Sequence, residues 1–161
     1  MYTPSRTALL YSLLALASGT PISRSTLAAA GESWTITSMS RNCTASLSEC
    51  TWTFGIETPI DGEMGAVTDW CEHTVLSPGA GTPATRVPAG ESPASSCGKD
   101  GRFTVASGWS GVFGEGEGFT VLSVADYAAR TIAFPSYRDR DVEGGAVVVP
   151  DKNCTVGVIP A

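Results

Sequence analysis

The chain has 161 residues and carries 16 acidic against 10 basic side chains, which gives a formal net charge of −6. This acidic balance, without a cluster of lysines or arginines, argues against binding to nucleic acid and to anionic membranes. The length is sufficient for one domain with a sizeable hydrophobic core, so no second domain is required.

Residues 1–19 have the features of a secretory signal peptide. Arg6 supplies the positive charge, residues 8–17 form a short apolar run, and small residues precede the expected cut after Gly19. The run is shorter than the roughly 20 apolar residues that a membrane-spanning helix needs, and no later segment qualifies. We therefore expect a secreted, extracellular protein without membrane insertion. Two alternative cut sites are open: Ala28-Ala29-Ala30 and the bond after Arg24.

Residues 20–32 are expected to form a short flexible segment, followed by a single β domain over residues 33–161. Two strands open this domain, at residues 33–39 and 50–56. In the first, Trp34 and Ile36 alternate with serine and threonine, and the second repeats this pattern with tryptophan, phenylalanine and isoleucine. Apolar residues at every second position are typical of a strand with one buried face.

A cluster of turn residues at 58–65 leads to a third strand, residues 67–76. The composition then changes sharply, because residues 77–96 carry prolines at regular intervals among serine, threonine, glycine and alanine. Proline interrupts strands and the apolar content is low, so this segment predicts one long exposed loop. Such a loop is either a passive insertion or a binding feature.

The clearest strand pattern belongs to a central hairpin, residues 102–109 and 119–126. Val121, Leu122 and Val124 make the second strand apolar on both faces, which indicates a central position in a sheet. Glycines in the connection are expected to permit positive φ values. They are Gly108, Gly111, Gly114, Gly116 and Gly118.

Short strands are also predicted at residues 130–134, 146–149 and 154–159, with a solvated charged turn at residues 138–141. The total is about eight short strands with frequent turn signals and no convincing helix. This pattern predicts an all-β fold, a single-domain antiparallel β-sandwich or barrel closed by disulfides.

Cysteines in a secreted chain predict disulfide bridges, and any four of the five present here can pair in three ways. We favour Cys43–Cys50 and Cys71–Cys97, because each bridge closes a loop already bounded by strands. Cys154 is then either a buried free thiol in a monomer or a bridge between two chains of a dimer.

Several residues are candidates for modification or for recognition of a partner. Asn42 and Asn153 begin N-glycosylation sequons, each with cysteine in the middle position. Glu115 and Glu117 are candidate recognition residues in the glycine-rich connection. Trp70 and Trp109 are candidates for surface recognition or carbohydrate binding, although tryptophan more often belongs to the core of a β-sandwich because indole has a large apolar area.

No catalytic motif is complete. The run from Gly108 to Val112 lacks the last glycine of the nucleophile elbow and lies between strands, which favours a hairpin turn. His73 is the single histidine and has no activated nucleophile in view, so an ordinary structural role is more typical. We expect no catalytic residue, no cofactor and no metal site.

One enzymatic alternative stays open, a secreted hydrolase of cell-wall polysaccharide. Glycoside hydrolysis requires two carboxyl groups, and their separation decides the chemistry. Two clusters offer such groups: Asp61, Glu63 and Asp69, with Asp61 and Asp69 as the leading pair, or Asp139 and Asp141.

Specific motifs extend over most of the chain: Ser33-Trp34-Thr35-Ile36, Arg41-Asn42-Cys43, the run from Cys50 to Ile56, the run from Ser107 to Gly111, Phe113-Gly114, the run from Gly118 to Val124, Pro135-Ser136-Tyr137 with Asp139, and Val149-Pro150-Asp151. By these motifs the chain resembles the small secreted proteins of ascomycete fungi, a group that includes hypersensitive-response-inducing elicitors of plant pathogens. The cysteines of the two favoured bridges match those expected in the group. Cys154 and the proline-rich segment depart from it.

The resemblance implies a compact, β-rich secreted protein that plant tissue perceives, with no established catalytic residues. We therefore expect a fungal effector or elicitor that acts by recognition, without catalysis, in the apoplast or at the host surface. The expected partner is a host plant protein or a cell-wall glycan.

Overall fold

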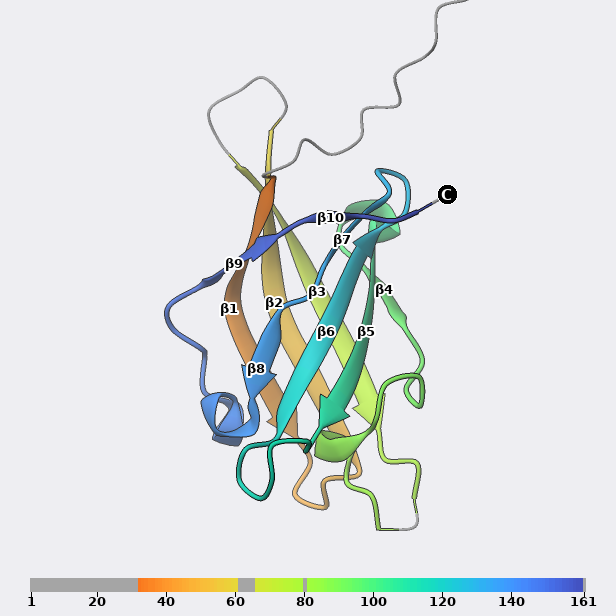
Figure 1. Cartoon of the computed structure of the whole chain (residues 1–161), viewed down its shortest axis with the longest axis vertical. Helices are drawn as coiled ribbons and strands as arrows, with labels where there is room; N and C mark the ends of the chain where they lie inside the picture. Colours follow the sequence, from red (N-terminus) through yellow and green to blue (C-terminus); the bar gives the residue numbers. More distant parts are fainter. Residues whose placement is uncertain (1–31, 61–65, 80, 161) are drawn as a thin grey trace, which may run out of the picture.

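The computed structural model describes residues 32–60, 66–79 and 81–160 (Figure 1). The predicted signal peptide and all but the last residue of the 20–32 segment lie outside these residues. Within them, helical structure is limited to 3₁₀ turns, and none is long and apolar enough to cross a membrane. These turns are η1 (Ala84–Arg86), η2 (Lys99–Gly101), η3 (Asp139–Asp141) and η4 (Glu143–Gly145).

Two antiparallel sheets face each other and form a β-sandwich (Figure 1). The first sheet has the strand order β3-β2-β1-β9, with bounds Ala66–Leu76, Glu49–Pro59, Ser33–Cys43 and Lys152–Thr155. The second has the order β10-β7-β6-β5-β4, with bounds Gly157–Val158, Thr131–Ala133, Phe119–Asp126, Phe103–Ser110 and Ser95–Cys97. A further strand, β8 (Ser136–Arg138), pairs with the first half of β6.

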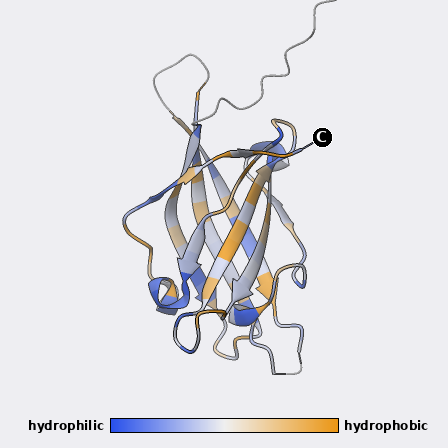
Figure 2. Ribbon diagram, viewed as in Figure 1, coloured by the Kyte–Doolittle hydropathy of each residue, from blue (hydrophilic) through white to orange (hydrophobic). Residues whose placement is uncertain are grey.

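The predicted alternation places the core between the sheets. Trp34 and Phe54 from the first sheet are at most 1% exposed, as are Phe103 and Leu122 from the second. The indole of Trp34 meets the ring of Phe103 edge to face, with 5.4 Å between ring centroids. Hydrophobic and hydrophilic residues alternate along the strands, so each sheet presents one apolar face inward (Figure 2).

The edges of the two sheets are connected, although the strands do not close into a barrel. On one side, β9 and β10 are nearly continuous, and they pair with β1 and β7 in different sheets. On the other side, the Cys71–Cys97 disulfide joins β3 to β4, and the backbone N–H of Gly98 donates to the carbonyl of Trp70 at 3.1 Å. A bridge across 26 residues stabilises the fold by about 3.5 kcal/mol in the chain-entropy account.

The described residues contain ten strands, more than the predicted eight, and the first three strands have 11 residues each. The β1 strand continues past its predicted end at Met39 because a β-bulge shifts the register between Thr37 and Ser40. Ser38 adopts φ 52° at the bulge, and its N–H donates to the carboxylate of Asp151 at 3.0 Å. The bulge therefore preserves the inward face of a longer strand.

The segment predicted as one exposed loop, residues 77–96, is exposed over much of its length but is anchored to the core. Ala84 and Val87 are 4% and 3% exposed, and Val87 belongs to the main core. The carbonyl of Val87 accepts a hydrogen bond from the N–H of Trp109 at 2.9 Å, and β4 begins at Ser95. The segment packs against β5 because a few small or apolar residues between its prolines find partners there.

His73 is fully buried where β3 lies beside β4 and β5. Its Nδ1 is 2.9 Å from Ser95 Oγ and its Nε2 is 3.0 Å from Ser107 Oγ, so both ring nitrogens are satisfied by neutral hydroxyl groups. Burial lowers the pKa of His73 below its ordinary value of 6.5. The histidine therefore joins the two sheets in its neutral form.

This arrangement predicts a specific pH dependence of stability. Above pH 6.5 the imidazole is neutral in both the folded and unfolded states, whereas below it the unfolded chain binds a proton that the folded chain resists. The free energy of unfolding should fall as the pH decreases from 6.5 toward the lowered pKa, by at most about 1.4 kcal/mol per pH unit. Urea denaturation at a series of pH values measures this slope.

The matched variant is His73→Gln, which keeps a hydrogen-bonding side chain but cannot titrate. Because His73 is the single histidine of the chain, this variant should lose the slope between pH 6.5 and about 5, above the range where carboxylates titrate. Equal slopes for the two proteins in that window would contradict the role given to His73.

Candidate functional site

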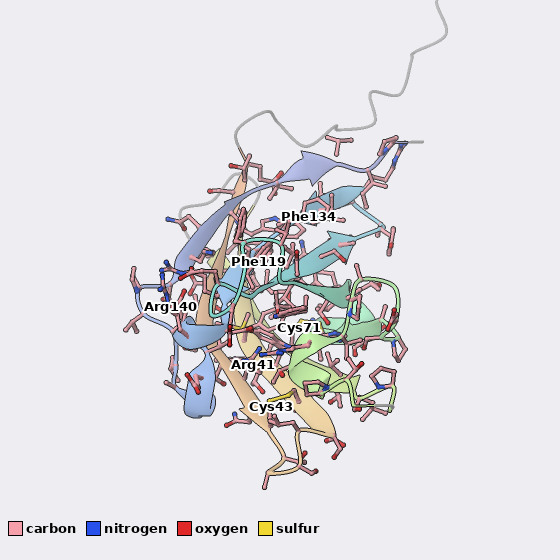
Figure 3. All side chains as sticks on the ribbon, turned by 60° about the horizontal axis from the view of Figure 1, so that its bottom comes forward. Arg41, Cys43, Cys71, Phe119, Phe134 and Arg140 are labelled. Atoms are coloured by element: carbon pink, nitrogen blue, oxygen red, sulfur yellow. A yellow bond between two sulfur atoms is a disulfide. The ribbon has the colours of Figure 1, made fainter. Side chains whose placement is uncertain are left out.

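An open cleft of about 920 Å³ lies at one end of the sandwich. Four segments meet there: the β1–β2 turn, η1, the β5–β6 loop, and the η3–η4 region. Figure 3 brings this end forward, with Arg41, Cys43 and Arg140 labelled. The cleft is therefore built by loops that the two sheets hold in place, which is a common position for a binding site.

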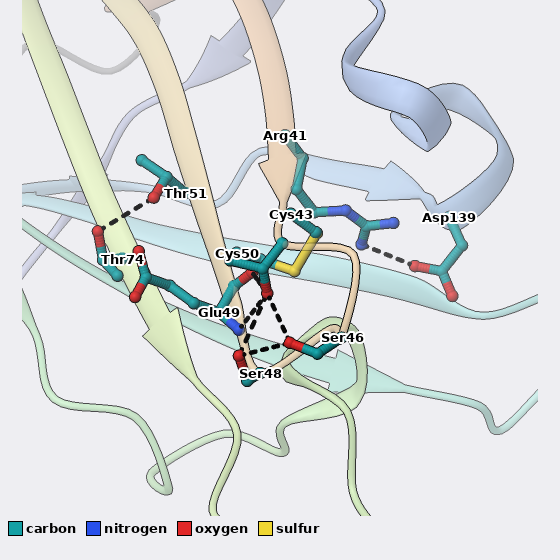
Figure 4. Close-up of a disulfide and its surroundings, with 10 residues drawn as sticks. Arg41, Cys43, Ser46, Ser48, Glu49, Cys50, Thr51, Thr74 and Asp139 are labelled. Carbon is teal, nitrogen blue, oxygen red and sulfur yellow. Dashed lines mark hydrogen bonds and ion pairs between the residues drawn. A yellow bond between two sulfur atoms is a disulfide. The ribbon is translucent and has the colours of Figure 1, made fainter.

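Asp139 connects the floor of the cleft to both sheets. One carboxylate oxygen accepts a hydrogen bond from Arg41 Nη1 of β1 at 3.1 Å (Figure 4), and the other accepts one from Trp109 Nε1 of β5 at 2.9 Å. Arg41 is 6% exposed and Asp139 is 31% exposed. This network fixes η3 relative to β1 and β5.

Arg41 is an inward-facing residue of β1 whose charge is held at the cleft floor. Its guanidinium carbon lies 5.2 Å from the ring centroid of Trp52, within the range of a cation–π contact. Among the described residues, Arg41 Nε is buried without a hydrogen-bond partner. The positive charge thus depends on one carboxylate and one aromatic face.

The rim of the cleft carries charges of both signs. The guanidinium carbon of Arg86 lies 5.6 Å from the ring centroid of Trp109, and Arg140 pairs with Glu117 at 3.6 Å. Both members of the second pair are about half exposed, so that pair contributes little to stability. The rim is suited to polar contacts with a partner, and Glu115 adds a further carboxylate to it.

The five glycines at the end of β5 and in the β5–β6 loop serve two purposes. Gly114 and Gly116 have φ values of +101° and +78°, as predicted, whereas the other three glycines do not have a positive φ. A Cβ at Gly111 would lie 2.5 Å from the indole of Trp109, and one at Gly118 would lie 2.8 Å from its Nε1. Close packing around the indole therefore requires glycine at both positions.

The Cys43–Cys50 disulfide closes the β1–β2 turn beside the cleft (Figure 4). This bridge and Cys71–Cys97 are the two pairs favoured from the sequence. Hydroxyl groups of Thr44, Ser46 and Ser48 form hydrogen bonds within the turn, between 2.9 and 3.4 Å. Bridge and hydrogen bonds together hold this wall of the cleft.

The other predicted site residues fall into two places. Trp109 and Glu115 line the cleft, with Glu117 on its rim, whereas Trp70 lies on the outer face of β3 and is 60% exposed. The structure thus brings the hairpin candidates together and separates Trp70 from them. Trp109 is only partly exposed, because its indole is a structural contact as well as a lining group.

Both sequon asparagines are exposed. Asn42 lines the cleft, so a glycan on it would stand at the cleft entrance. Asn153 lies on β9, where its Oδ1 accepts a hydrogen bond from Thr35 Oγ1 at 2.7 Å. Glycosylation at Asn153 would therefore decorate the outer face of the first sheet.

Cys154 is 8% exposed and takes part in neither disulfide. Its Sγ is 3.8 Å from the carbonyl oxygen of Lys152, and burial raises the pKa of its thiol. A bridge to a second chain through Cys154 would require β9 to move away from the core.

The carboxylates proposed for hydrolysis are engaged in structural contacts where the structure describes them. Asp69, which is 6% exposed, accepts hydrogen bonds from Arg102 and from the N–H of Lys99. Asp141 pairs with Arg138 at 3.1 Å, and Asp139 binds Arg41 and Trp109 as described above. Asp61 and Glu63 lie outside the described residues.

Arg41 was missed as a site residue from the sequence, and Asp139 was considered only as one carboxylate of a hydrolytic pair. Residues 138–141 were predicted to be a solvated turn, yet Asp139 accepts two hydrogen bonds from residues far away in the chain. Arg41 occupies an inward position of a strand, like Trp34 and Ile36 before it. An arginine in such a position signals a buried counter-charge.

The fold and site define a class of protein: an antiparallel β-sandwich, tied at its edges, with a polar cleft at one end. A family model described as Effector TSP1 matches residues 35–158. A protein named Effector TSP1 from Hypocrea virens (strain Gv29-8 / FGSC 10586) is 35% identical over 146 residues, which is 91% of this chain and 89% of that protein. The chain belongs to the Effector TSP1 family. The predicted resemblance to fungal effector-like proteins is thereby confirmed.

The network at Asp139 predicts a large effect of one substitution. Asp139→Asn keeps the side-chain shape but leaves the buried Arg41 without a counter-charge, which should lower the free energy of unfolding by about 2 kcal/mol. Urea denaturation measures this change. The control is Asp141→Asn in the neighbouring exposed pair, which should cost less than about 0.5 kcal/mol. Equal losses for the two variants would show that the network is not a special stabilising contact.

Proposed function

We propose that this effector-like protein is secreted and acts outside the cell, in the apoplast or at a host surface, by recognition rather than catalysis. The end cleft is its recognition site. Its partner is a host protein or a cell-wall glycan that contacts the charged rim and the polar floor.

The Arg41–Asp139–Trp109 network is the observation that carries this proposal. Its hydrogen bonds hold the floor of the cleft rigid. Arg86, Glu115 and Arg140 on the rim remain to contact a partner. A site whose geometry is fixed before binding loses less conformational entropy on association. This arrangement suits specific binding.

The chemistry of the described residues supports a non-catalytic role. The hydroxyl of Ser110, the serine of the incomplete elbow motif, accepts a hydrogen bond from the N–H of Val112 within the hairpin loop. His73 binds two serine hydroxyls in the core, away from the residues that line the cleft. Asp69, Asp139 and Asp141 are engaged by arginine, tryptophan or backbone donors. These contacts favour a binding protein over a hydrolase.

Infiltration of purified protein into leaves of several plant species tests the proposal. The wild type should cause a tissue response in at least one host. Glu115→Lys and Arg86→Glu, which reverse exposed rim charges, should weaken it by about tenfold in the dose required, since each opposes a complementary charge on the partner. Cell death and defence-gene induction are the measured responses.

The matched control is Glu91→Lys, an exposed charge reversal outside the cleft, which should leave the response unchanged. Circular dichroism of each variant establishes that it is folded. An absent wild-type response in every host, beside a working positive control, would contradict the proposed function. An undiminished response with both rim variants would instead contradict the assignment of the cleft.

A further inference from the structure

A second surface, separate from the cleft, surrounds Trp70 on the outer face of the first sheet. Trp70 is an outward-facing residue of β3, paired with Gly55 of β2, and 60% of its side chain is exposed. Its neighbours along β3 on the same face are Thr68 and Glu72. None of these residues lines the end cleft, so this face is available independently.

The indole of Trp70 does not serve to cover the glycine opposite it. A Cβ built on Gly55 would meet Thr37 and Thr68 first, and its three nearest atoms include none from Trp70. These threonines fill the space above Gly55, which is itself buried. At 60% exposure, the indole presents a large part of its apolar ring to solvent, where it can pack against a ligand.

Carboxylates lie on both sides of Trp70 along the two strands. Glu72 follows Trp70 by two residues on β3, and Glu57 lies diagonally on β2, opposite Thr68. Glu57 and Glu72 are separated along the strands by about 13 Å, the rise of four residues. Among the described outward-facing residues of β1, β2, β3 and β9, the charged ones are all glutamates: Glu49, Glu57 and Glu72.

We propose that this face binds a polymer of β-linked glucosamine whose amino groups are free and protonated. Charge complementarity favours a cationic ligand, because two glutamates flank the indole and the described outward-facing strand residues of this sheet include no arginine or lysine. The indole attracts an ammonium group over its ring and packs against the apolar face of a sugar. This binding goes beyond the recognition role of the cleft and does not depend on it.

The neighbouring side chains favour a sugar polymer over a basic peptide. Thr53 and Thr68 lie beside the indole and offer short hydroxyl groups that exchange hydrogen bonds with sugar hydroxyls. These side chains extend across the strands. The edge of β3 is not free at Trp70, because the carbonyl of Trp70 already accepts a hydrogen bond from the N–H of Gly98. An added peptide strand would need that edge.

Calorimetric titration with a fully deacetylated glucosamine hexamer in mildly acidic buffer tests the proposal. The wild type should bind it, and Trp70→Ala should weaken the affinity by about tenfold. The double variant Glu57→Gln/Glu72→Gln should weaken it similarly and reduce its dependence on salt. Retention on beads of deacetylated chitin, with fully acetylated chitin beside them, provides a second readout.

Two controls match these variants in type. Phe134→Ala removes another aromatic ring that is 60% exposed, and Glu91→Gln neutralises another exposed glutamate; both should bind as the wild type does. Thermal unfolding of each variant verifies its fold. The proposal is overturned if the wild type does not bind the hexamer, if Trp70→Ala binds equally well, or if the acetylated polymer is retained as strongly. Preference for polylysine over the hexamer would also overturn it, in favour of a basic peptide.

Discussion

The carboxylate of Asp139 accepts a hydrogen bond from each of the two sheets, through Arg41 of β1 and Trp109 of β5. The consequence is a cleft whose floor is fixed by polar contacts and whose walls are closed by the Cys43–Cys50 bridge and by close packing of Gly111 and Gly118 on the indole. Geometry of this kind suits recognition, since the binding groups need little rearrangement.

Burial of Arg41 has a cost that the network offsets. Its guanidinium group is shielded from water by Trp52 and retains a single carboxylate partner, so removal of that partner would leave a buried charge unpaired. The contact between the sheets at His73 differs, because the hydrogen bonds of His73 to Ser95 and Ser107 involve neutral groups. The apolar core supplies most of the stability, and these two polar clusters fix how the sheets meet. On the Trp70 face, in contrast, no ion pair between described residues holds the charged side chains.

Local patterns in the sequence were enough to predict the sandwich, but not the site. Alternation placed Trp34, Ile36 and Phe54 inward, and the same alternation gave the central hairpin almost to the residue. Bridge partners followed because each pair bounds a strand connection. The contact between Asp139 and Arg41 could not be predicted in this way, since the two residues are 98 positions apart in the chain. Val87 was likewise assigned to an exposed loop because its partner on β5 is a tertiary contact. The exposure of Trp70, by contrast, was within reach: Cys71 must point inward to form its bridge, so its neighbour points outward.

If Asp139 binds the indole of Trp109 and thereby fixes the cleft, the indole Nε1–H proton of Trp109 must be protected from solvent. Solvent exchange of the indole Nε1–H protons, measured by NMR on uniformly labelled protein, tests this. We expect slow exchange for Trp109, whose Nε1 is 2.9 Å from the carboxylate, and fast exchange for the exposed Trp70. Exchange at Trp109 as fast as at Trp70 would contradict the claim and remove the physical basis for a rigid recognition cleft.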